Sequence, residues 1–347
     1  MTKTGKKVLD EMFMELAKAR VLYRPSLFWI KLNAIHLHHL SKSGINNFKR
    51  SINGKYFSWG TLGIIRHQLW PVFATLIKGN ISPLFVSSFQ NYDLNLGKGV
   101  RRFNPFSALI YRIYVASLYE FVFNEDEYQI LNKLKEPMTG NPFVIEYKDR
   151  LISEDLCNSV HEFYSITRYV LINEHRKIEI AELGSGYGRL GYIFLKIVPN
   201  SAYCFIDIPP ALYIAQFYIS KIFPKEKIFK FRPFSSFREI KKEFEQSRIR
   251  FLMPHQIELL PKKYFDLFIN VSSLHEMNRK QIRNYINQAD RLCKGYYYTK
   301  QWRKSRTEDN NFIKEREYPI PKKWQVIFKR ERHPIQNMFF DKLYKIN

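Results

Sequence analysis

The segment IEIAELGSGYGRLG, residues 178–191, carries the signals that decide the fold of this chain. Its β-branched run from Ile178 is typical of a buried strand, and this run ends at Glu182-Leu183. Gly184-Ser185-Gly186-Tyr187-Gly188 follows at once, and glycines let the chain reverse tightly while a ligand approaches the backbone. The segment therefore predicts a strand, a glycine-rich turn and a helix that begins at Arg189.

Two classes of cofactor fit this turn, and the acidic residue before it distinguishes them. Gly186, Gly188 and Gly191 match G-x-G-x-x-G, which places a dinucleotide pyrophosphate on a helix N-terminus. In that pattern the first glycine follows the strand directly, and counted from Gly184 an arginine occupies the third position. Glu182 would repel a pyrophosphate, whereas it attracts the ammonium group or accepts the ribose hydroxyls of S-adenosylmethionine. The Glu182 carboxylate therefore favours S-adenosylmethionine over NAD. Alternatively, the turn is purely structural and binds no ligand.

Strands alternate with helices through the rest of the chain. The predicted elements are helices at Arg189–Val198 and Arg279–Leu292 and strands at Ser201–Ile206, Ile249–Met253, Phe265–Val271 and Tyr296–Gln301, with Gly295 as a break before the last. This order indicates an α/β fold with a doubly wound, mostly parallel sheet. The charged segment Arg303–Arg316 is expected to be a mobile loop, and two final strands are expected at Trp324–Phe328 and Asn337–Tyr344.

Ligands of such a sheet bind at the carboxyl ends of its strands. Asp207 ends the second strand about twenty residues beyond the glycines, where an acidic side chain accepts ribose hydroxyls. Alternatively, Asp207 only caps the helix that begins near Pro210. The candidate cofactor-binding residues are Glu182, Gly184, Ser185, Gly186, Tyr187, Gly188, Asp207, Ile208, His255, Gln256 and Asn270.

Four segments resemble one family. They are NPFVIEYKDRLISEDLCNS (141–159), ELGSGYGRLG (182–191), FDLFINVSSLHEM (265–277) and YYYTKQW (296–302). They are similar to class I S-adenosylmethionine-dependent methyltransferases, whose E-x-G-x-G-x-G turn matches Glu182–Gly188, and more narrowly to bacterial sugar O-methyltransferases. The resemblance covers about residues 137–302. It implies a Rossmann-like sheet with an antiparallel last strand, and methylation of a hydroxyl on a surface-polysaccharide sugar or its activated precursor.

Such a transfer is an in-line displacement, and a sugar hydroxyl needs a general base to take its proton. His275 is the first candidate because the unperturbed pKa of histidine lies near neutrality; Glu276 and His255, at the end of the neighbouring strand, are the others. Alternatively, His275 only packs or contacts the methionyl group. Adjacent side chains on an extended segment point in opposite directions, so one of His275 and Glu276 should face the acceptor. Arg168 and Tyr169 could reach the cofactor carboxylate or only face solvent.

The chain is expected to divide near residue 137. Helical patterns at 8–22, 27–40, 61–77 and 106–123, with no strand-rich run, predict a helical N-terminal region over residues 1–136. Residues 137–347 would form the cofactor-binding domain, joined through the linker Lys135–Pro142. Without a signal-peptide pattern or a run of eighteen apolar residues, the expected location is the cytoplasm.

No metal site is predicted. The histidines at positions 36, 38 and 39 lack an acidic or cysteine partner at ligand spacing. The three cysteines lack the spacing of disulfides or metal ligands, so they are expected to be reduced core residues: Cys157, Cys204 and Cys293.

The formal net charge of +24 is large and spread along the whole chain. It could reflect an AT-rich genome that enriches lysine, attraction to an anionic membrane face or phosphate-bearing sugar carrier, or binding of nucleic acid. The third reading is disfavoured because no nucleic-acid-binding module is recognisable. The expected acceptor is a sugar or glycan, free or linked to a nucleotide or lipid. The alternatives are a nucleic-acid methyltransferase and a cofactor-binding partner protein without catalysis.

Overall fold

The computed structural model describes residues 3–51, 88–90, 104–170, 176–306 and 312–346, which fall into two compact units. The first unit holds the described residues of 35–165 together with 334–337. The second holds 3–34, 166–333 and 338–346. The domain boundary near residue 137 stays a prediction, and the predicted helix at 61–77 lies outside the described residues.

The first unit combines helices with a small antiparallel sheet. Its strands pair in the order β1-β2-β3: β1 (Ser88–Gln90), β2 (Val144–Tyr147) and β3 (Arg150–Ile152). Its helical elements are η2 (Ile45–Asn47), α3 (Phe48–Ser51), α5 (Pro105–Asn124), α6 (Ile130–Lys133), and parts of α2 (Leu27–Ser43) and α7 (Glu154–Thr167). β1 was not predicted, since three residues are too few to show an alternating pattern.

Helix α5, with 20 residues, is the longest described helix of this unit. Asn104 caps it by accepting a hydrogen bond from the Ser107 N–H, and proline occupies its first turn. Tyr111 donates its hydroxyl to the Phe143 carbonyl beside β2. By length and composition α5 is the one helix of the described chain that could cross a membrane, but a buried core helix passes the same test.

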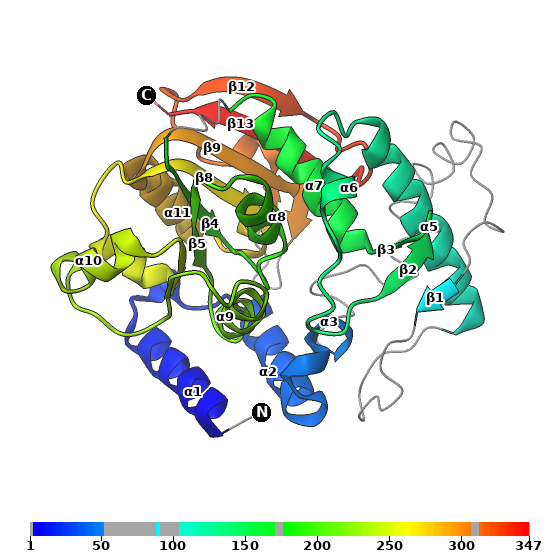
Figure 1. Cartoon of the computed structure of the whole chain (residues 1–347). Coiled ribbons are helices and arrows are strands. Elements are labelled where there is room, and N and C mark those ends of the chain that lie inside the picture. Colours follow the sequence, from blue (N-terminus) through cyan, green and yellow to red (C-terminus); the bar gives the residue numbers. More distant parts are fainter. Residues whose placement is uncertain (1–2, 52–87, 91–103, 171–175, 307–311, 347) are drawn as a thin grey trace. The chain divides into compact units, whose positions relative to one another are not determined.

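An eight-stranded sheet forms the second unit, in the order β12-β13-β9-β8-β4-β5-β7-β6 (Figure 1). The strands are β4 (Ile178–Leu183), β5 (Ser201–Ile206), β6 (Ile228–Phe229), β7 (Ile249–Leu252), β8 (Phe265–Val271), β9 (Cys293–Trp302), β12 (Gln325–Arg330) and β13 (Phe339–Lys345). Every pair from β6 to β9 is parallel, and β13 runs antiparallel to both of its neighbours. The predicted α/β class, a mostly parallel Rossmann-like sheet with an antiparallel last strand, is confirmed.

Helices cover both faces of this sheet. The remaining elements of the unit are α1 (Lys3–Lys18), η1 (Val21–Tyr23), α8 (Arg189–Ile197), α9 (Ala211–Ile222), α10 (Phe237–Gln246), η4 (Pro254–Leu259), η5 (Leu274–Glu276), α11 (Arg279–Leu292), β10 (Lys304–Arg306), β11 (Phe312–Lys314) and η6 (Glu315–Glu317). Gly191 of α8 and Ile219 of α9 both lie against the sheet near Phe205. α10 and α11 contribute to the core cluster on the opposite face.

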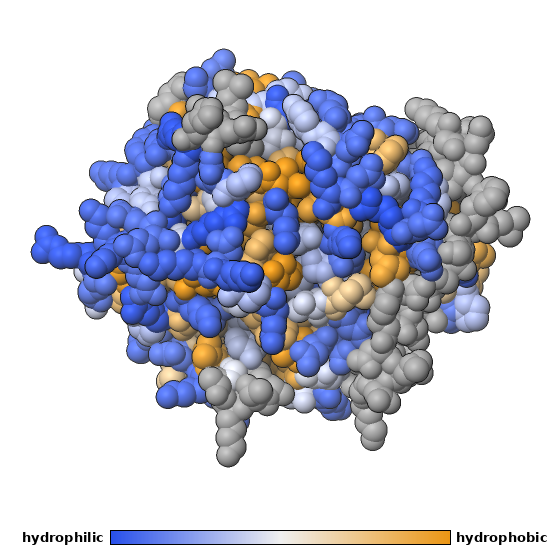
Figure 2. Space-filling view, in the orientation of Figure 1, coloured by the Kyte–Doolittle hydropathy of each residue, from blue (hydrophilic) through white to orange (hydrophobic). Residues whose placement is uncertain are grey.

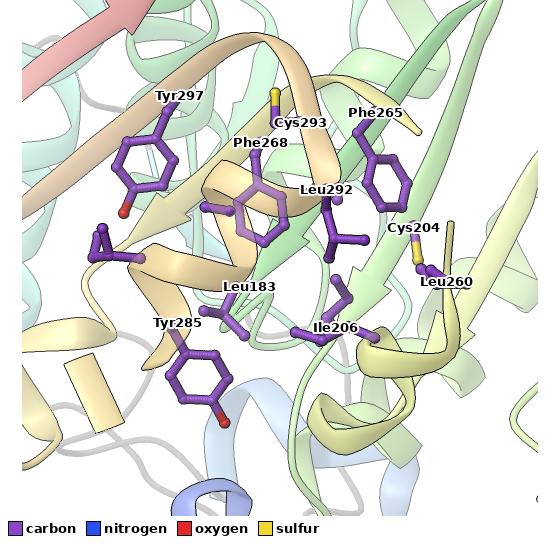
Figure 3. Close-up of a cluster of buried hydrophobic side chains, with 14 of the residues drawn as sticks. Leu183, Cys204, Ile206, Leu260, Phe265, Phe268, Tyr285, Leu292, Cys293 and Tyr297 are labelled. Atoms are coloured by element: carbon purple, nitrogen blue, oxygen red, sulfur yellow. The ribbon is translucent and has the colours of Figure 1, made fainter. Parts of the chain in front are cut away.

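That core cluster joins the sheet to α11. Leu183 and Phe268 from β4 and β8 gather with Tyr285 and Leu292 from α11 (Figure 3). Tyr23, from the N-terminal segment, belongs to the same cluster. Burying a large apolar side chain contributes about 1.5–3 kcal/mol, so this layer holds the strand ends firmly. All three cysteines are buried and free, as predicted.

Two sequence-based expectations about loops were wrong. Gly295 is no break, because it lies inside β9, where Lys294 and Gly295 together face Asp266 of β8 in a register irregularity. Arg303–Arg316 is not simply a loop in its described part, because β10 and β11 pair antiparallel there.

Candidate active site

The glycine-rich turn lies at the topological switch point of the sheet. The chain leaves β4 for β5 on one side, and later enters β8 on the other side of β4. Crossovers therefore diverge at the carboxyl end of β4, where open α/β sheets bind their ligands.

The backbone of the turn requires its glycines. Gly184, Gly186 and Gly188 have φ angles of +73°, +57° and +91°. A Cβ atom at Gly184 would lie 2.3 Å from the Ser273 Oγ, so no other residue fits there without displacing the end of β8. Gly191 serves packing instead, because its Cβ would lie 2.3 Å from the Phe205 ring. The turn is thus fixed by the adjacent strand ends.

Asp207 ties the end of β5 to this turn. Its Oδ2 accepts a 2.8 Å hydrogen bond from the Gly186 N–H, and its Oδ1 accepts one of 2.7 Å from the Ile208 N–H. Burial raises the pKa of Asp207 to about 7, against the lowering effect of these two bonds. The capping alternative was wrong, because Pro210 is the N-cap of α9 and no side chain caps it. Each carboxylate oxygen keeps a second lone pair for a ligand hydroxyl.

The other residues of the turn differ in their partners. The buried Glu182 accepts a 2.8 Å hydrogen bond from the Tyr203 hydroxyl on β5. Tyr187 packs edge-on against Tyr218 of α9. The Ser185 hydroxyl is buried and has no hydrogen-bond partner among the described residues. A buried hydroxyl without a partner is costly, so Ser185 is suited to bond a ligand.

An amide pair links the ends of β4, β8 and β9. Asn270 donates its Nδ2 to the Leu183 carbonyl at 2.7 Å. The Gln301 Nε2 donates to the Oδ1 and carbonyl oxygen of Asn270 and to the Thr299 hydroxyl. Asn270 is therefore a structural link beside the turn, and its predicted contact with the cofactor stays a prediction.

His275 lies in the 3-10 turn η5 after β8 and is almost fully buried. Its ring stacks on Trp302, with centroids 4.8 Å apart. Because the Gln301 Nε2 is engaged as a donor, its Oε1 faces the His275 Nδ1 at 3.0 Å, which assigns the ring proton to Nδ1. Burial lowers the pKa of His275 to about 4, so the ring is neutral at pH 7 and Nε2 carries the lone pair.

Glu276 lies next to the basic atom of this ring. Its Oε1 is 3.7 Å from the His275 Nε2, and its Oε2 accepts a 3.1 Å hydrogen bond from the Trp29 indole. Burial raises the pKa of Glu276 well above its ordinary value. The expectation that the two side chains point apart was wrong, because η5 is a helical turn and not an extended segment.

His255 and Gln256 occupy the turn η4 after β7. Gln256 bonds the backbone with both ends of its amide, since Oε1 accepts from the Met253 N–H and Nε2 donates to the Arg232 carbonyl. His255 is partly buried, its Nδ1 lacks a partner among the described residues, and burial lowers its pKa. Contrary to expectation, β7 does not neighbour β8, because β4 and β5 separate them.

Other candidates lie elsewhere. Tyr169 stacks on Phe328 of the edge strand β12, which is not beside the glycine turn. His36 is buried in α2. No group of three histidine, cysteine, aspartate or glutamate residues in the described part of the chain could hold a metal ion.

Sequence reasoning missed the residues that hold His275 and Glu276. Gln301 and Trp302 end β9, and the convergence of strand ends in a parallel sheet could have identified them. Trp29 is 247 residues from Glu276, and no local pattern indicates such a contact.

No family model and no curated protein match the chain. Solved structures do match. A SAM dependent methyltransferase from Aquifex aeolicus is 13% identical, with 53% of this chain and 89% of that chain covered and a TM-score of 0.34. Geranyl diphosphate C-methyltransferase from Streptomyces coelicolor A3(2) is 10% identical, with 55% of this chain and 81% of that chain covered and a TM-score of 0.38. Burkholderia thailandensis 1,6-didemethyltoxoflavin-N1-methyltransferase is 9% identical, with 75% of this chain and 100% of that chain covered and a TM-score of 0.36. Identities and TM-scores this low establish neither a family nor an activity.

Proposed function

We propose that this chain is an S-adenosylmethionine-dependent methyltransferase that acts on a hydroxyl of a surface-polysaccharide sugar or its activated precursor. The observation that carries the proposal is the glycine-rich turn at the switch point, held to the end of β5 by the bond from Gly186 to Asp207.

The residues at the turn suit an adenosine cofactor that lacks phosphates. Glu182 and Asp207 place two carboxyl groups at the ends of β4 and β5, where a pyrophosphate would be repelled. The Ser185 hydroxyl supplies a buried group without a partner among the described residues. We expect Asp207 to accept ribose hydroxyls and the backbone of Gly184–Gly188 to contact the ligand, with Ile208, His255 and Gln256 beside it. When bound, the cofactor supplies an electrophilic methyl group on sulfur.

The base that receives the acceptor's proton is expected among His275, Glu276 and His255. His275 is neutral at pH 7 and keeps a lone pair on Nε2, as general-base catalysis requires. The sugar acceptor rests on the resemblance of four sequence segments and not on a side-chain contact. A cytoplasmic location, with an acceptor that is free, nucleotide-linked or lipid-linked, belongs to the same proposal.

Calorimetry with S-adenosylmethionine and with NAD tests the cofactor. We expect the wild type to bind only the former, and Gly186→Val to abolish binding, because a β-branched residue is disfavoured at a φ of +57°. Tight binding of NAD alone would contradict the proposal. Comparing surface glycans from cells with and without the gene, by mass spectrometry, tests the acceptor.

A further inference from the structure

Within the second unit, a segment from the N-terminal part of the chain packs beside the predicted base. Tyr23 donates its hydroxyl to Glu258 at 2.6 Å, and the Gln281 amide donates to the Arg24 carbonyl at 2.7 Å. Ser26 donates its hydroxyl to the Glu276 carbonyl oxygen at 3.0 Å. Three bonds to three different elements therefore fix the segment that carries Trp29.

Trp29 makes the direct contact with the Glu276 side chain. Its indole N–H donates to Oε2 at 3.1 Å, while Oε1 of the same carboxyl group faces the His275 Nε2 at 3.7 Å. The carboxyl group is thus held in one orientation, with Oε2 bonded to Trp29 and Oε1 facing His275.

Exposure distinguishes the two members of the His275–Glu276 pair. The Glu276 side chain is 20% exposed, whereas that of His275 is 3% exposed. The histidine ring is also stacked on Trp302 and bonded through Nδ1 to Gln301. An acceptor can therefore reach the carboxyl group more readily than the ring behind it.

We propose that Glu276 receives the acceptor's proton and that Trp29 is a positioning residue that holds its carboxyl group beside His275. This inference rests on the proposed methyl transfer and assigns roles within that site.

The step is balanced in atoms and electrons. The acceptor's O–H proton moves to the Glu276 carboxylate as the oxygen forms a bond to the methyl carbon. The carbon–sulfur bond breaks, its electron pair stays on sulfur, and the proton is later released to solvent. The adjacent neutral His275 accepts a proton less readily, because burial lowers the pKa of its ring to about 4, whereas burial raises the pKa of Glu276.

Trp29 also affects how easily Glu276 ionises. Its N–H bond to the carboxylate lowers the pKa of Glu276, while burial and the charge of Asp207 raise it. His275 lies beside the group, and Tyr318 interacts with it electrostatically. Removing the indole N–H should therefore move the ionisation of Glu276 to higher pH.

The chain offers a matched control for this test. Trp324 donates its indole N–H to the Asp290 Oδ1 at 2.8 Å, away from η5 at the end of α11. Trp324→Phe removes the same kind of bond as Trp29→Phe, so loss of general stability should be shared by both variants.

The experiment measures S-adenosylhomocysteine formation from S-adenosylmethionine and a panel of nucleotide-linked hexoses across pH. Glu276→Gln should lower kcat by about a hundredfold or more with cofactor affinity unchanged. Trp29→Phe should move the acid limb of the kcat profile to higher pH, with about a tenfold loss for each pH unit of displacement and recovery at high pH. Trp324→Phe should leave the profile in place. Infrared titration of the carboxyl band that disappears in Glu276→Gln should show the same displacement without any acceptor.

Full kcat in Glu276→Gln overturns the assignment of the base. An unmoved profile and infrared titration in Trp29→Phe, or equal displacement in Trp324→Phe, overturn the positioning role. A wild-type protein that binds no S-adenosylmethionine overturns the proposed function and this inference with it. If the wild type binds S-adenosylmethionine and turns it over, the proposed function stands, and only the base assignment or the positioning role can have failed.

Discussion

At the scale of single residues, the polar groups of the site hold strand ends together before any ligand arrives. Asp207 fixes Gly186, and Asn270 fixes the end of β4. Gln301 orients both Asn270 and His275. Because these side chains are already hydrogen-bonded to the protein, little reorganisation is needed when a ligand binds, and that preorganisation favours both affinity and rate.

Gly184→Ala tests whether the turn needs glycine for space or for conformation. Gly44 has nearly the same φ, +71°, but a Cβ there would meet nothing within 4 Å. Gly184→Ala should cost the backbone about 1–2 kcal/mol. Gly44→Ala should cost about 1–3 kcal/mol, because a φ of +71° with a ψ of 164° is almost restricted to glycine. Only Gly184→Ala should add about 1–3 kcal/mol from overlap with Ser273 and lose cofactor affinity. Urea unfolding measures stability and calorimetry measures cofactor affinity, and an unchanged cofactor affinity in Gly184→Ala would contradict the argument from space.

Asp207 should make stability fall as pH rises. Its pKa is about 7 in the folded protein and 3.8 ordinarily, so between these values the folded state binds a proton that the unfolded state has lost. The free energy of unfolding then decreases with pH, by roughly 4 kcal/mol at most.

Denaturation at pH 4.5 and 7.5 should show a smaller decrease in Asp207→Asn than in the wild type. Asp290→Asn is the control, because the bonds from Lys323 and Trp324 lower the pKa of Asp290 and it stays ionised across this range. If the free energy of unfolding falls as much in Asp207→Asn as in the wild type, Asp207 is not the group that makes stability fall with pH. Weaker cofactor binding in Asp207→Ala, by roughly 1.5–3 kcal/mol, would separately support ribose contact.

At the scale of elements, the long central strands were predictable and the irregular ones were not. β5, β8 and α11 have the predicted bounds, because a mostly buried, largely apolar run marks the two strands and a strong apolar period marks the helix. β6 and β10 contain two and three residues, too few for any period. Gly295 was read as a breaker, yet it is where β9 crowds the Asp266 carbonyl. The same limit applies to the site. The residues at the ends of the strands could be predicted from the sequence, whereas Trp29 could not, because no local pattern indicates its contact with Glu276.

Gly295→Ala should disrupt the pairing of β8 with β9. A Cβ at Gly295 would lie 2.2 Å from the Asp266 carbonyl oxygen, and backbone cannot move aside as a flexible side chain can. We expect a loss of about 1–3 kcal/mol in the free energy of unfolding. Lys294→Ala, in the same irregularity with a 40% exposed side chain, should change it by about 0.5 kcal/mol or less. Chemical denaturation measures the free energy of unfolding of both variants. Equal values for Gly295→Ala and Lys294→Ala would show that β8 and β9 can move apart to admit the extra methyl group at little cost.

At the scale of the whole molecule, charge is the dominant property. The net charge is +24, and hydrophilic side chains cover much of the face in Figure 2, including the area over α10. A field of this sign attracts anions over about a Debye length, which is about 10 Å at 0.1 M salt and 3 Å at 1 M. Charge therefore bears on the acceptor, because a nucleotide-linked sugar is anionic and a free sugar is not.

Salt should separate these two kinds of acceptor. If phosphates guide the acceptor, its KM should rise several-fold between about 0.1 M and 1 M salt. The KM of a free neutral sugar, measured in parallel, should stay constant. Equal salt dependence of both would assign the basic surface to solvation alone, and the same measurement with RNA would expose the steeper dependence that phosphate-backbone binding requires.

The contact between Arg24 and Gln281 has a consequence for synthesis. These residues are 257 positions apart, so the segment that carries Tyr23 and Trp29 leaves the ribosome long before its partners. At roughly 5–20 residues per second, the wait lasts on the order of 13–50 s. During that time the aromatic side chains of Tyr23 and Trp29 lack the downstream residues that they contact in the folded chain, and transiently exposed apolar surface of this kind favours aggregation.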